Sequence, residues 1–387
     1  MLRSPGSVPE AVERARRVAA EVAAPGAGHT DEGNWPAASL RALQEAGLGG
    51  LSAPVSAGGA GLGLRALAGV CEVLGAACAS SGLCYGMHVV ATAVIAAKAT
   101  EAQTEEYLAP IAAGEHLTTL ALSEPGTGAQ FWLPQTRLRR TGDGYVVDGG
   151  KSFVTNGGYA DSYVLSTVAA DPDAPVGQFS CVVVPAGSPG MTWTGGWDGV
   201  GMRGNSSRQV RLDGVRVPAD GLLGAEGDQI WYVFEVVAPY FLVAMAGTYL
   251  GVAQAAFDAA RAHLGARRHE HTGRALAAQP LLQHRLGQLW AQLQRTRRLV
   301  HWAAEEADAG GPDALPALAA AKAEVADCAV GIANEAMTLV GGIGYRGRSP
   351  LERHLRDARA AHVMSPTTDL LRTWTGRALL GVPLLAD

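Results

Sequence analysis

Apolar residues recur along this chain with two different periods, and the period changes twice. From Glu10 to about Gly114, Ala and Leu return at spacings of three and four residues, which predicts helices. From about Leu117 to Leu223, short β-branched runs lie between Asp-Gly, Gly-Gly and Pro-Gly turns, which predicts a small antiparallel barrel or sandwich. Long helices rich in Ala, Leu and Gln return from Asp228 onward.

This order of elements predicts an α+β fold with three domains. We expect an N-terminal helical domain at residues 1–116, a middle antiparallel β-barrel at 117–226 and a C-terminal four-helix bundle at 227–387. The length of 387 residues and the hydrophobic content of 48% are enough for a large core divided among such packed units.

One segment raises the question of a membrane, because Val236–Phe257 contains no charged residue and is long enough to cross a bilayer. Pro239, Gly247 and Gln254 interrupt it, so we expect a helix buried inside the C-terminal bundle and no membrane contact. Charges recur through Arg17 near the N-terminus. They leave no apolar core for a signal peptide, which favours a cytoplasmic protein.

The charge balance and the cysteines argue against several classes of function. A formal net charge of −5 disfavours nucleic-acid binding, which needs a basic patch or stripe. The five cysteines show no Cys-x-x-Cys spacing, so we expect reduced thiols with neither a disulfide framework nor a zinc site. The run Arg267–His271 resembles a metal site only in its spacing, and solvated charge or contact with a cofactor phosphate is the better interpretation.

Two segments of the β region carry the clearest chemistry. Ser123–Gly128 (Ser-Glu-Pro-Gly-Thr-Gly) joins a hydroxyl to a turn whose glycines let backbone N–H groups approach a flat polar ligand. Lys151–Gly158 (Lys-Ser-Phe-Val-Thr-Asn-Gly-Gly) places an aromatic residue, Phe153, and a hydroxyl residue, Thr155, at the end of a predicted strand. Each segment alone is a weak signal, but the two occur together with further segments in a definite order.

With these additional segments, the chain resembles the acyl-CoA dehydrogenase family over nearly its whole length. The resemblance implies an FAD-dependent enzyme and a homodimer or homotetramer in which the flavin site is completed across subunits. The additional segments are Ala46-Gly47-Leu48, Met202–Ser206, Val215–Pro218, Gly341–Tyr345 and Arg356-Asp357-Ala358.

The resemblance also implies roles for individual residues. The hydroxyls of Ser123 and Thr155 are expected to hydrogen-bond the isoalloxazine, and Phe153 is expected to pack on the ring where the family usually has Trp. Other residues expected to contact the cofactor are Gly128, Arg268, Gln279, Gly341, Gly342 and Thr367.

The chain departs from the family where the catalytic base is expected. The usual glutamate lies nine residues after the Arg of Arg-Asp-Ala, and Ser365 stands there. A hydroxyl with an ordinary pKa far above 7 cannot take an α-proton unaided. The alternative base position on the apolar helix is Phe241, which with Tyr240 is expected to line the substrate pocket. Candidates to act at this site are Ser365, His362, Asp369 and His88. His362 and Asp369 are expected on one face with Ser365 if the segment is helical around Pro366.

A second departure concerns residues that, in many relatives, cross to the partner subunit's FAD. Gly273 is kept, whereas His269, Thr272 and Pro280 occupy the other positions. Arg268 and Gln279 lie one residue away from two of these positions and are expected to substitute. In addition, Ala129-Gln130 replaces the family's Ser-Asp after the Glu-Pro segment, which removes a hydrogen-bonding group.

Three functions remain open from the sequence. The first is a dehydrogenase acting on an acyl thioester of CoA or a carrier protein, with an unusual base or with loss of a substrate carboxylate. The second is a flavin monooxygenase that uses reduced flavin and O₂ and needs no such base. The third is a non-catalytic subunit that pairs with an active paralogue. A flavin reductase or an electron-transfer flavoprotein is the expected redox partner.

Overall fold

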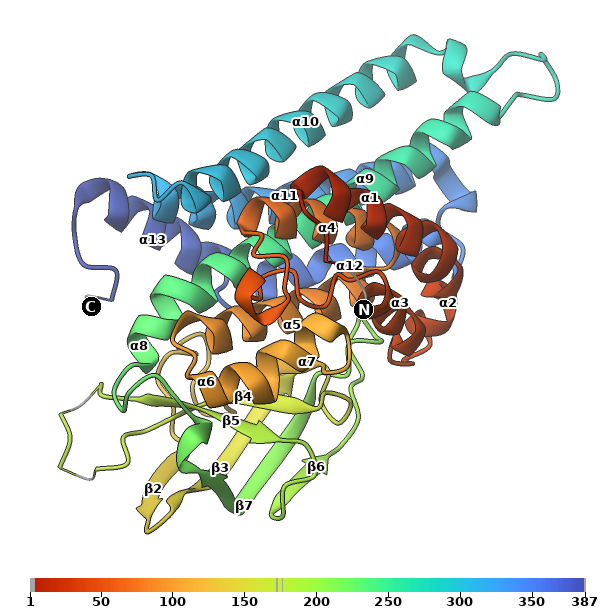
Figure 1. Cartoon of the computed structure of the whole chain (residues 1–387). Helices are drawn as coiled ribbons and strands as arrows, with labels where there is room; N and C mark the ends of the chain where they lie inside the picture. Colours follow the sequence, from red (N-terminus) through yellow and green to blue (C-terminus); the bar gives the residue numbers. More distant parts are fainter. Residues whose placement is uncertain (1–3, 172, 176, 386–387) are drawn as a thin grey trace.

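The computed structural model describes residues 4–171, 173–175 and 177–385 and shows a β layer below two sets of helices (Figure 1). Helices come first along the chain, strands follow, and long helices return, so the predicted α+β order is confirmed. The N-terminal elements are α1 (Val8–Val18), η1 (Ala19–Ala23), α2 (Ala24–Asp31), α3 (Ala37–Glu45), η2 (Val55–Ala57), α4 (Leu64–Ala77), α5 (Ala79–Ala97), α6 (Glu101–Gln103), η3 (Thr104–Leu108) and α7 (Ala109–Ala113).

The middle region consists of two four-stranded sheets with strand orders β1-β4-β5-β8 and β2-β3-β7-β6. Its pairings are antiparallel except for β1 with β4, which run parallel with Thr118 opposite Ser162. The sandwich form of the prediction therefore describes this region best. The strands are β1 (Thr118–Ala121), β2 (Arg137–Thr141), β3 (Gly144–Val154), β4 (Ser162–Thr167), β5 (Ser180–Pro185), β6 (Met191–Thr194), β7 (Arg208–Pro218) and β8 (Leu222–Leu223), with the short helix η4 (Ala219–Gly221) between the last two.

The C-terminal region is built from long helices that pack on α4 and α5. Glycines let α4 and α9 approach closely: a Cβ at Gly75 would lie 2.1 Å from Thr248 O, and one at Gly251 would lie 2.2 Å from Glu72 O. The elements are α8 (Gln229–Trp231), η5 (Tyr232–Val237), α9 (Ala238–Ala266), η6 (Leu276–Ala278), α10 (Pro280–Asp308), α11 (Ala314–Val340), η7 (Gly341–Ile343), α12 (Pro350–Val363) and α13 (Thr368–Leu380).

Two helical stretches, Ala79–Ala97 and Gln229–Ala266, are long and apolar enough to cross a membrane by length and composition alone. In their most apolar windows, 94% and 83% of the residues are buried inside the protein. The second stretch contains the uncharged segment singled out in the sequence, and it lies in the core of the helical region as expected.

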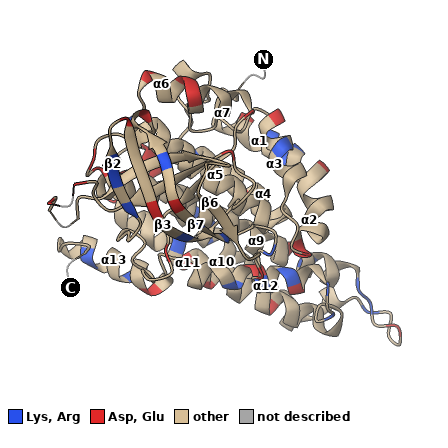
Figure 2. Cartoon of the chain, turned by 90° about the horizontal axis from the view of Figure 1, so that it is seen from below, with Lys and Arg blue, Asp and Glu red and all other residues tan. Residues whose placement is uncertain are grey.

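The C-terminal end of α9, the N-terminal end of α10 and the connection between them project away from the rest of the molecule (Figure 1). The first turns of α10 expose large apolar side chains, with Leu281 62% and Trp290 56% accessible to solvent. The connection carries Arg267, Arg268 and Arg274 and one acidic residue, Glu270, and Figure 2 shows both charges along it. The projection therefore combines an apolar helix face with a mostly basic connection.

Candidate functional site

A buried ion pair joins the two segments that carry the clearest chemistry in the sequence. Lys151 Nζ lies 2.6 Å from Glu124 Oε1, and both side chains are almost fully buried. The ammonium also donates to Ser166 O at 2.5 Å. The Glu124 carboxylate accepts from the amides of Gln135 at 2.9 Å and Thr136 at 3.1 Å. Burial lowers the pKa of Lys151 to about 8, and the Glu124 charge opposes that shift.

This pair was missed in the sequence, although one signal was available. Lys151 lies in a strand-forming segment between Val147 and Val154, and a charged residue is rarely buried in such a strand without a partner. The pair fixes residues 122–136, here called the Ser123 loop, against the end of β3. A second contact does the same, since the amide of Ser152 donates to Ser123 O at 2.9 Å. The two segments therefore meet in one place.

The end of β3 turns one aromatic ring outward. Phe153 has a φ of 57°, in the left-handed region that non-glycine residues rarely adopt, at an irregularity in the pairing with β7. Its side chain is 65% exposed, and its ring contacts Trp197 edge-to-face with centroids 6.3 Å apart. A large aromatic ring held in solvent by strained backbone offers a flat apolar surface to a planar ligand.

Hydroxyl groups flank this ring. Ser123 is partly exposed, and within the described residues its hydroxyl makes no hydrogen bond. Thr155 is 5% exposed, and its Oγ1 lies 3.2 Å from Ser207 Oγ. Gly128 has a φ of 54°, and a Cβ there would meet no atom within 4 Å, so the loop borders open space. The structure thus brings together the residues expected at the ring of a flavin.

Ser365 reaches this loop from the C-terminal region. Its Oγ donates to Ala129 O at 3.1 Å, so position 365 lies beside the Ser123 loop. The replacement bases proposed on the same helical face behave differently. α12 ends at Val363 and α13 begins at Thr368, so a turn containing Pro366 separates them. The expectation of one continuous helical face is therefore wrong.

His362 lies against Asp327 of α11. Its Nε2 lies 3.6 Å from Asp327 Oδ1, and its Nδ1 lies 3.3 Å from Thr368 Oγ1. Burial lowers the pKa of His362, and the Asp327 charge partly opposes this. Asp369 has a side chain that is 99% exposed, 3.9 Å from Arg372. Neither residue is brought into contact with Ser365.

His88 is buried, with only 1% of its surface exposed. Its Nδ1 accepts from Thr118 N at 3.1 Å, and its Nε2 lies 2.9 Å from Gly49 O and donates to it. Desolvation lowers its pKa to about 4. Both ring nitrogens of the neutral imidazole are therefore used by backbone groups, which leaves none for a substrate proton.

An aromatic cluster that the sequence did not predict lies where the Ser123 loop meets the C-terminal helices. Trp132 packs against Phe131, Phe234 of η5 and Trp374 of α13, with ring centroids 5.4, 6.3 and 5.6 Å away. Tyr240 and Phe241, which were expected to line the pocket, follow on α9 and are partly buried. Burial raises the pKa of Tyr240 to about 12, so its hydroxyl stays protonated.

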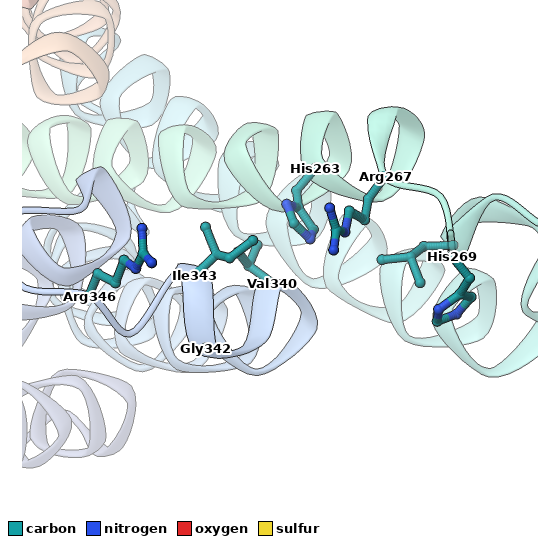
Figure 3. A pocket seen from close by; sticks show the side chains of 8 residues that line it. His263, Arg267, His269, Val340, Gly342, Ile343 and Arg346 are labelled. Carbon is teal, nitrogen blue, oxygen red and sulfur yellow. The ribbon is translucent and has the colours of Figure 1, made fainter. Parts of the chain in front are cut away.

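A separate pocket of about 400 Å³ lies between the end of α9 and the segment after α11 (Figure 3). Figure 3 shows His263 and Arg267 on α9 facing Val340 and Ile343. The pocket has four imidazole or guanidinium side chains and no carboxylate among its eight lining residues, so it suits an anion. They are His263, Arg267, His269, Leu276, Val340, Gly342, Ile343 and Arg346.

The pocket contains only some of the residues expected at the cofactor. Gly342 lines it, together with Arg267 and His269, whereas the Arg268 guanidinium donates to Gly273 O at 3.3 Å. Gln279 lies beside the pocket, with its Nε2 2.9 Å from His269 Nε2. Two other expected cofactor contacts lie elsewhere: Gly341 is exposed at the start of η7, and Thr367 begins α13 without a side-chain capping bond.

Comparison with known proteins agrees with this geometry. Family models described as the N-terminal, middle and C-terminal domains of acyl-CoA dehydrogenase match residues 9–115, 119–215 and 240–380. A probable acyl-CoA dehydrogenase of Bacillus subtilis, YngJ, is 31% identical over 92% of this chain and 93% of its own length. The chain belongs to the acyl-CoA dehydrogenase family.

Two further relatives support the same family. Cyclohex-1-ene-1-carbonyl-CoA dehydrogenase of Geobacter metallireducens is 31% identical over 95% of this chain and 97% of its own length. The structure of butyryl-CoA dehydrogenase from Megasphaera elsdenii superposes with a TM-score of 0.90 at 27% identity, covering 96% of this chain and 98% of that one. This member of the acyl-CoA dehydrogenase family is therefore an FAD-dependent oxidoreductase.

The residues of the acyl-CoA dehydrogenase site fit FAD. The exposed face of Phe153 suits an isoalloxazine, and the unpaired Ser123 hydroxyl supplies a hydrogen-bonding group beside it. The cationic pocket around Arg267 and Arg346 suits a diphosphate. It lies at the molecular surface, where a second subunit's cofactor could reach it.

Proposed function

We propose that the protein is an FAD-dependent dehydrogenase of acyl thioesters, carried by CoA or a carrier protein, that works without a carboxylate at the family's base position. The observation that carries the proposal is the contact of Ser365 Oγ with Ala129 O, in the loop that follows Ser123. In this proposal the neutral hydroxyl of Ser365 lies next to the reacting carbons of the thioester.

The residues of the chain have distinct tasks in this reaction. FAD, when bound, accepts the hydride that leaves Cβ of the acyl group. Thr155 and Ser123 hold the flavin edge, Phe153 covers one face, and the Trp132 cluster with Tyr240 and Phe241 keeps water from the acyl chain. Ser365 orients the thioester and cannot itself take the Cα proton.

Without a carboxylate, the electron pair at Cα has two sources. Water held near Ser365 can accept the Cα proton, or a carboxylate attached directly to Cα can leave as CO₂ so that the electrons of the broken C–C bond remain on Cα. In the second case the C–C bond breaks, hydride leaves Cβ, and no proton has to be removed. Both routes transfer two electrons to the flavin, so CO₂ release measured beside flavin reduction separates them.

The experiment is anaerobic mixing of the purified holoenzyme with saturated acyl-CoA probes and with probes that carry a carboxylate on Cα. Loss of flavin absorbance with formation of a 2,3-unsaturated product supports the proposal. The monooxygenase alternative rests on the same absence of a glutamate, and the relatives named above do not support it. The non-catalytic alternative predicts flavin binding without reduction by any probe.

The partners follow from the same family membership and are proposals too. The exposed apolar start of α10, with Leu281 and Trp290, suits a second copy of the chain, which would give a homodimer or homotetramer. An electron-transfer flavoprotein suits the role of oxidant for the reduced flavin. We place the enzyme in the cytoplasm.

A further inference from the structure

Lys322 is a buried cation whose contacts all belong to one turn. It lies in the middle of α11 with no exposed surface. Its Nζ donates to Ala361 O at 2.8 Å, Met364 O at 3.0 Å and Pro366 O at 2.9 Å. An ammonium has three N–H groups, so its whole donor capacity goes to residues 361–366, here called the 361–366 turn.

This cation has no anionic partner to explain it. Among the described residues, no carboxylate oxygen lies within 4.0 Å of Lys322 Nζ, whereas Lys151 has Glu124. Burying an unpaired charge is costly, and desolvation lowers the pKa of Lys322 to about 8. The three carbonyls are therefore the only groups in the described structure that offset the cost.

The contact also sets the direction of the Ser365 backbone. The Met364–Ser365 peptide is trans, so the amide N–H of Ser365 points opposite to the Met364 carbonyl. Because that carbonyl points at Lys322, the Ser365 amide points away from α11. The Ser365 side chain meets Ala129 O, so the 361–366 turn is held between Lys322 and the Ser123 loop.

We propose that Lys322 is a positioning residue of the reaction: its ammonium holds the 361–366 turn so that Ser365 faces the Ser123 loop and the substrate. The role of Lys322 in the reaction rests on the proposed function, whereas its hydrogen bonds to the 361–366 turn do not. Lys322→Met tests it, because methionine has a similar length and no donor. Lys151→Met is the matched control, since it removes the other fully buried lysine.

Hydrogen exchange of the holoenzyme, followed by mass spectrometry, reads the turn directly. In Lys322→Met we expect amides of residues 361–368 to exchange about ten- to a hundredfold faster. This change in rate corresponds to the free energy of about one or two buried hydrogen bonds. In Lys151→Met the faster exchange should appear around Glu124 and Ser166 instead. Unchanged exchange of the 361–366 turn in Lys322→Met would overturn the proposal.

A second test uses the wild-type protein, so it does not depend on whether a variant folds. A neutral amine has two N–H groups, so one carbonyl loses its donor as pH rises through about 8, and exchange of the 361–366 turn, corrected for intrinsic rates, should accelerate. The charged groups around the turn are His362, Asp327, Arg359 and Arg372. In the unfolded chain a lysine has a pKa of about 10.4. Between pH 8 and about 10.4 the unfolded state therefore binds more protons than the folded state, and the contribution of Lys322 to the free energy of unfolding rises with pH. Faster exchange confined to the turn is therefore not global unfolding, and a flat pH profile would contradict the proposal.

Kinetics connect the turn to the reaction. With butyryl-CoA and octanoyl-CoA as probes, Lys322→Met should lower the flavin reduction rate at saturation about tenfold or more while FAD content stays at the wild-type level. A loosened turn with an unchanged reduction rate would overturn the positioning role. If neither probe nor any other thioester reduces the wild-type flavin, the proposed function fails, and the exchange experiment still decides whether Lys322 holds the turn.

Discussion

Lys151 and Glu124 form a buried ion pair of 2.6 Å that fastens the Ser123 loop to the strand carrying Phe153 and Thr155. The pair joins residues 27 positions apart and places both halves of the proposed flavin site on one rigid support. Its loss should therefore affect folding as well as cofactor binding.

Removing one partner of this pair should be strongly destabilising. Lys151→Met leaves the Glu124 carboxylate buried without its cation, and we expect a loss of about 3–5 kcal/mol in the free energy of unfolding. The double variant Lys151→Met/Glu124→Gln should lose less than the sum of the single variants. Urea unfolding measures both, with Arg261→Ala of an exposed pair as a control that changes little. Additive losses would show that the pair is not coupled.

Phe153 should matter for the cofactor and hardly for the fold. Because its side chain is 65% exposed, Phe153→Ala should leave the stability of the apoprotein unchanged. It should weaken FAD binding about ten- to a hundredfold, as expected for an aromatic ring that is buried only in the complex. Phe153→Trp should retain affinity. Flavin fluorescence quenching gives the dissociation constants, and unaltered affinity in Phe153→Ala would remove this ring from the site.

A carboxylate restored at the base position should help with ordinary substrates. Ser365→Glu should raise the rate of flavin reduction by saturated acyl-CoA by about 10²–10⁴, the range that general bases supply. Ser365→Ala should not gain this activity and serves as the matched variant. Stopped-flow absorbance under anaerobic conditions measures the rates. A Ser365→Glu protein that binds flavin and thioester yet gains nothing would show that Ser365 does not face Cα.

His88 should make the protein sensitive to acid and should be dispensable for proton transfer. The folded protein keeps His88 neutral down to a pKa of about 4, whereas the unfolded chain takes up a proton near 6.5. The unfolded state therefore binds more protons between these values, and stability falls as pH drops from 6.5 to 4. His354, whose pKa burial also lowers to about 4, contributes in the same direction.

His88→Gln should reduce this pH dependence and leave the remaining part due to His354. Urea midpoints at pH 4.5, 5.5 and 6.5 measure the slope for both proteins. An unchanged slope in His88→Gln would contradict the structural role. Loss of flavin reduction at neutral pH in a folded His88→Gln protein would return His88 to the list of candidate bases.

Local patterns in the sequence predicted what depends on local structure. The β-branched runs around Val147, Val164 and Val183 became strands, and those around Val164 and Val183 are buried at nearly every position. The uncharged segment that ends at Phe257 became a core helix. The Phe153 and Thr155 strand end was also foreseen. Each of these depends on neighbours within a few residues.

Long-range contacts were not predictable in this way. Trp132 meets Trp374, and Lys322 meets the 361–366 turn, only after separate helices and loops have packed. Asp369 was placed with Ser365 by counting helical turns across Pro366, but the helix is interrupted there. Similarly, Arg267 rather than Arg268 faces the cationic pocket, because the chain is extended after α9 and successive side chains there point to opposite sides.

The central claim is that this family member oxidises an acyl thioester without a carboxylate at position 365. The most direct test is anaerobic stopped-flow mixing of the wild-type holoenzyme with saturated acyl-CoA and with acyl-CoA that carries a carboxylate on Cα, followed by admission of O₂. The account predicts that at least one thioester reduces the flavin and yields a 2,3-unsaturated product. It also predicts that O₂ reoxidises the reduced flavin slowly and without an absorbing intermediate. Flavin that no thioester reduces, but that reacts with O₂ through a transient absorbing species after chemical reduction, would contradict it.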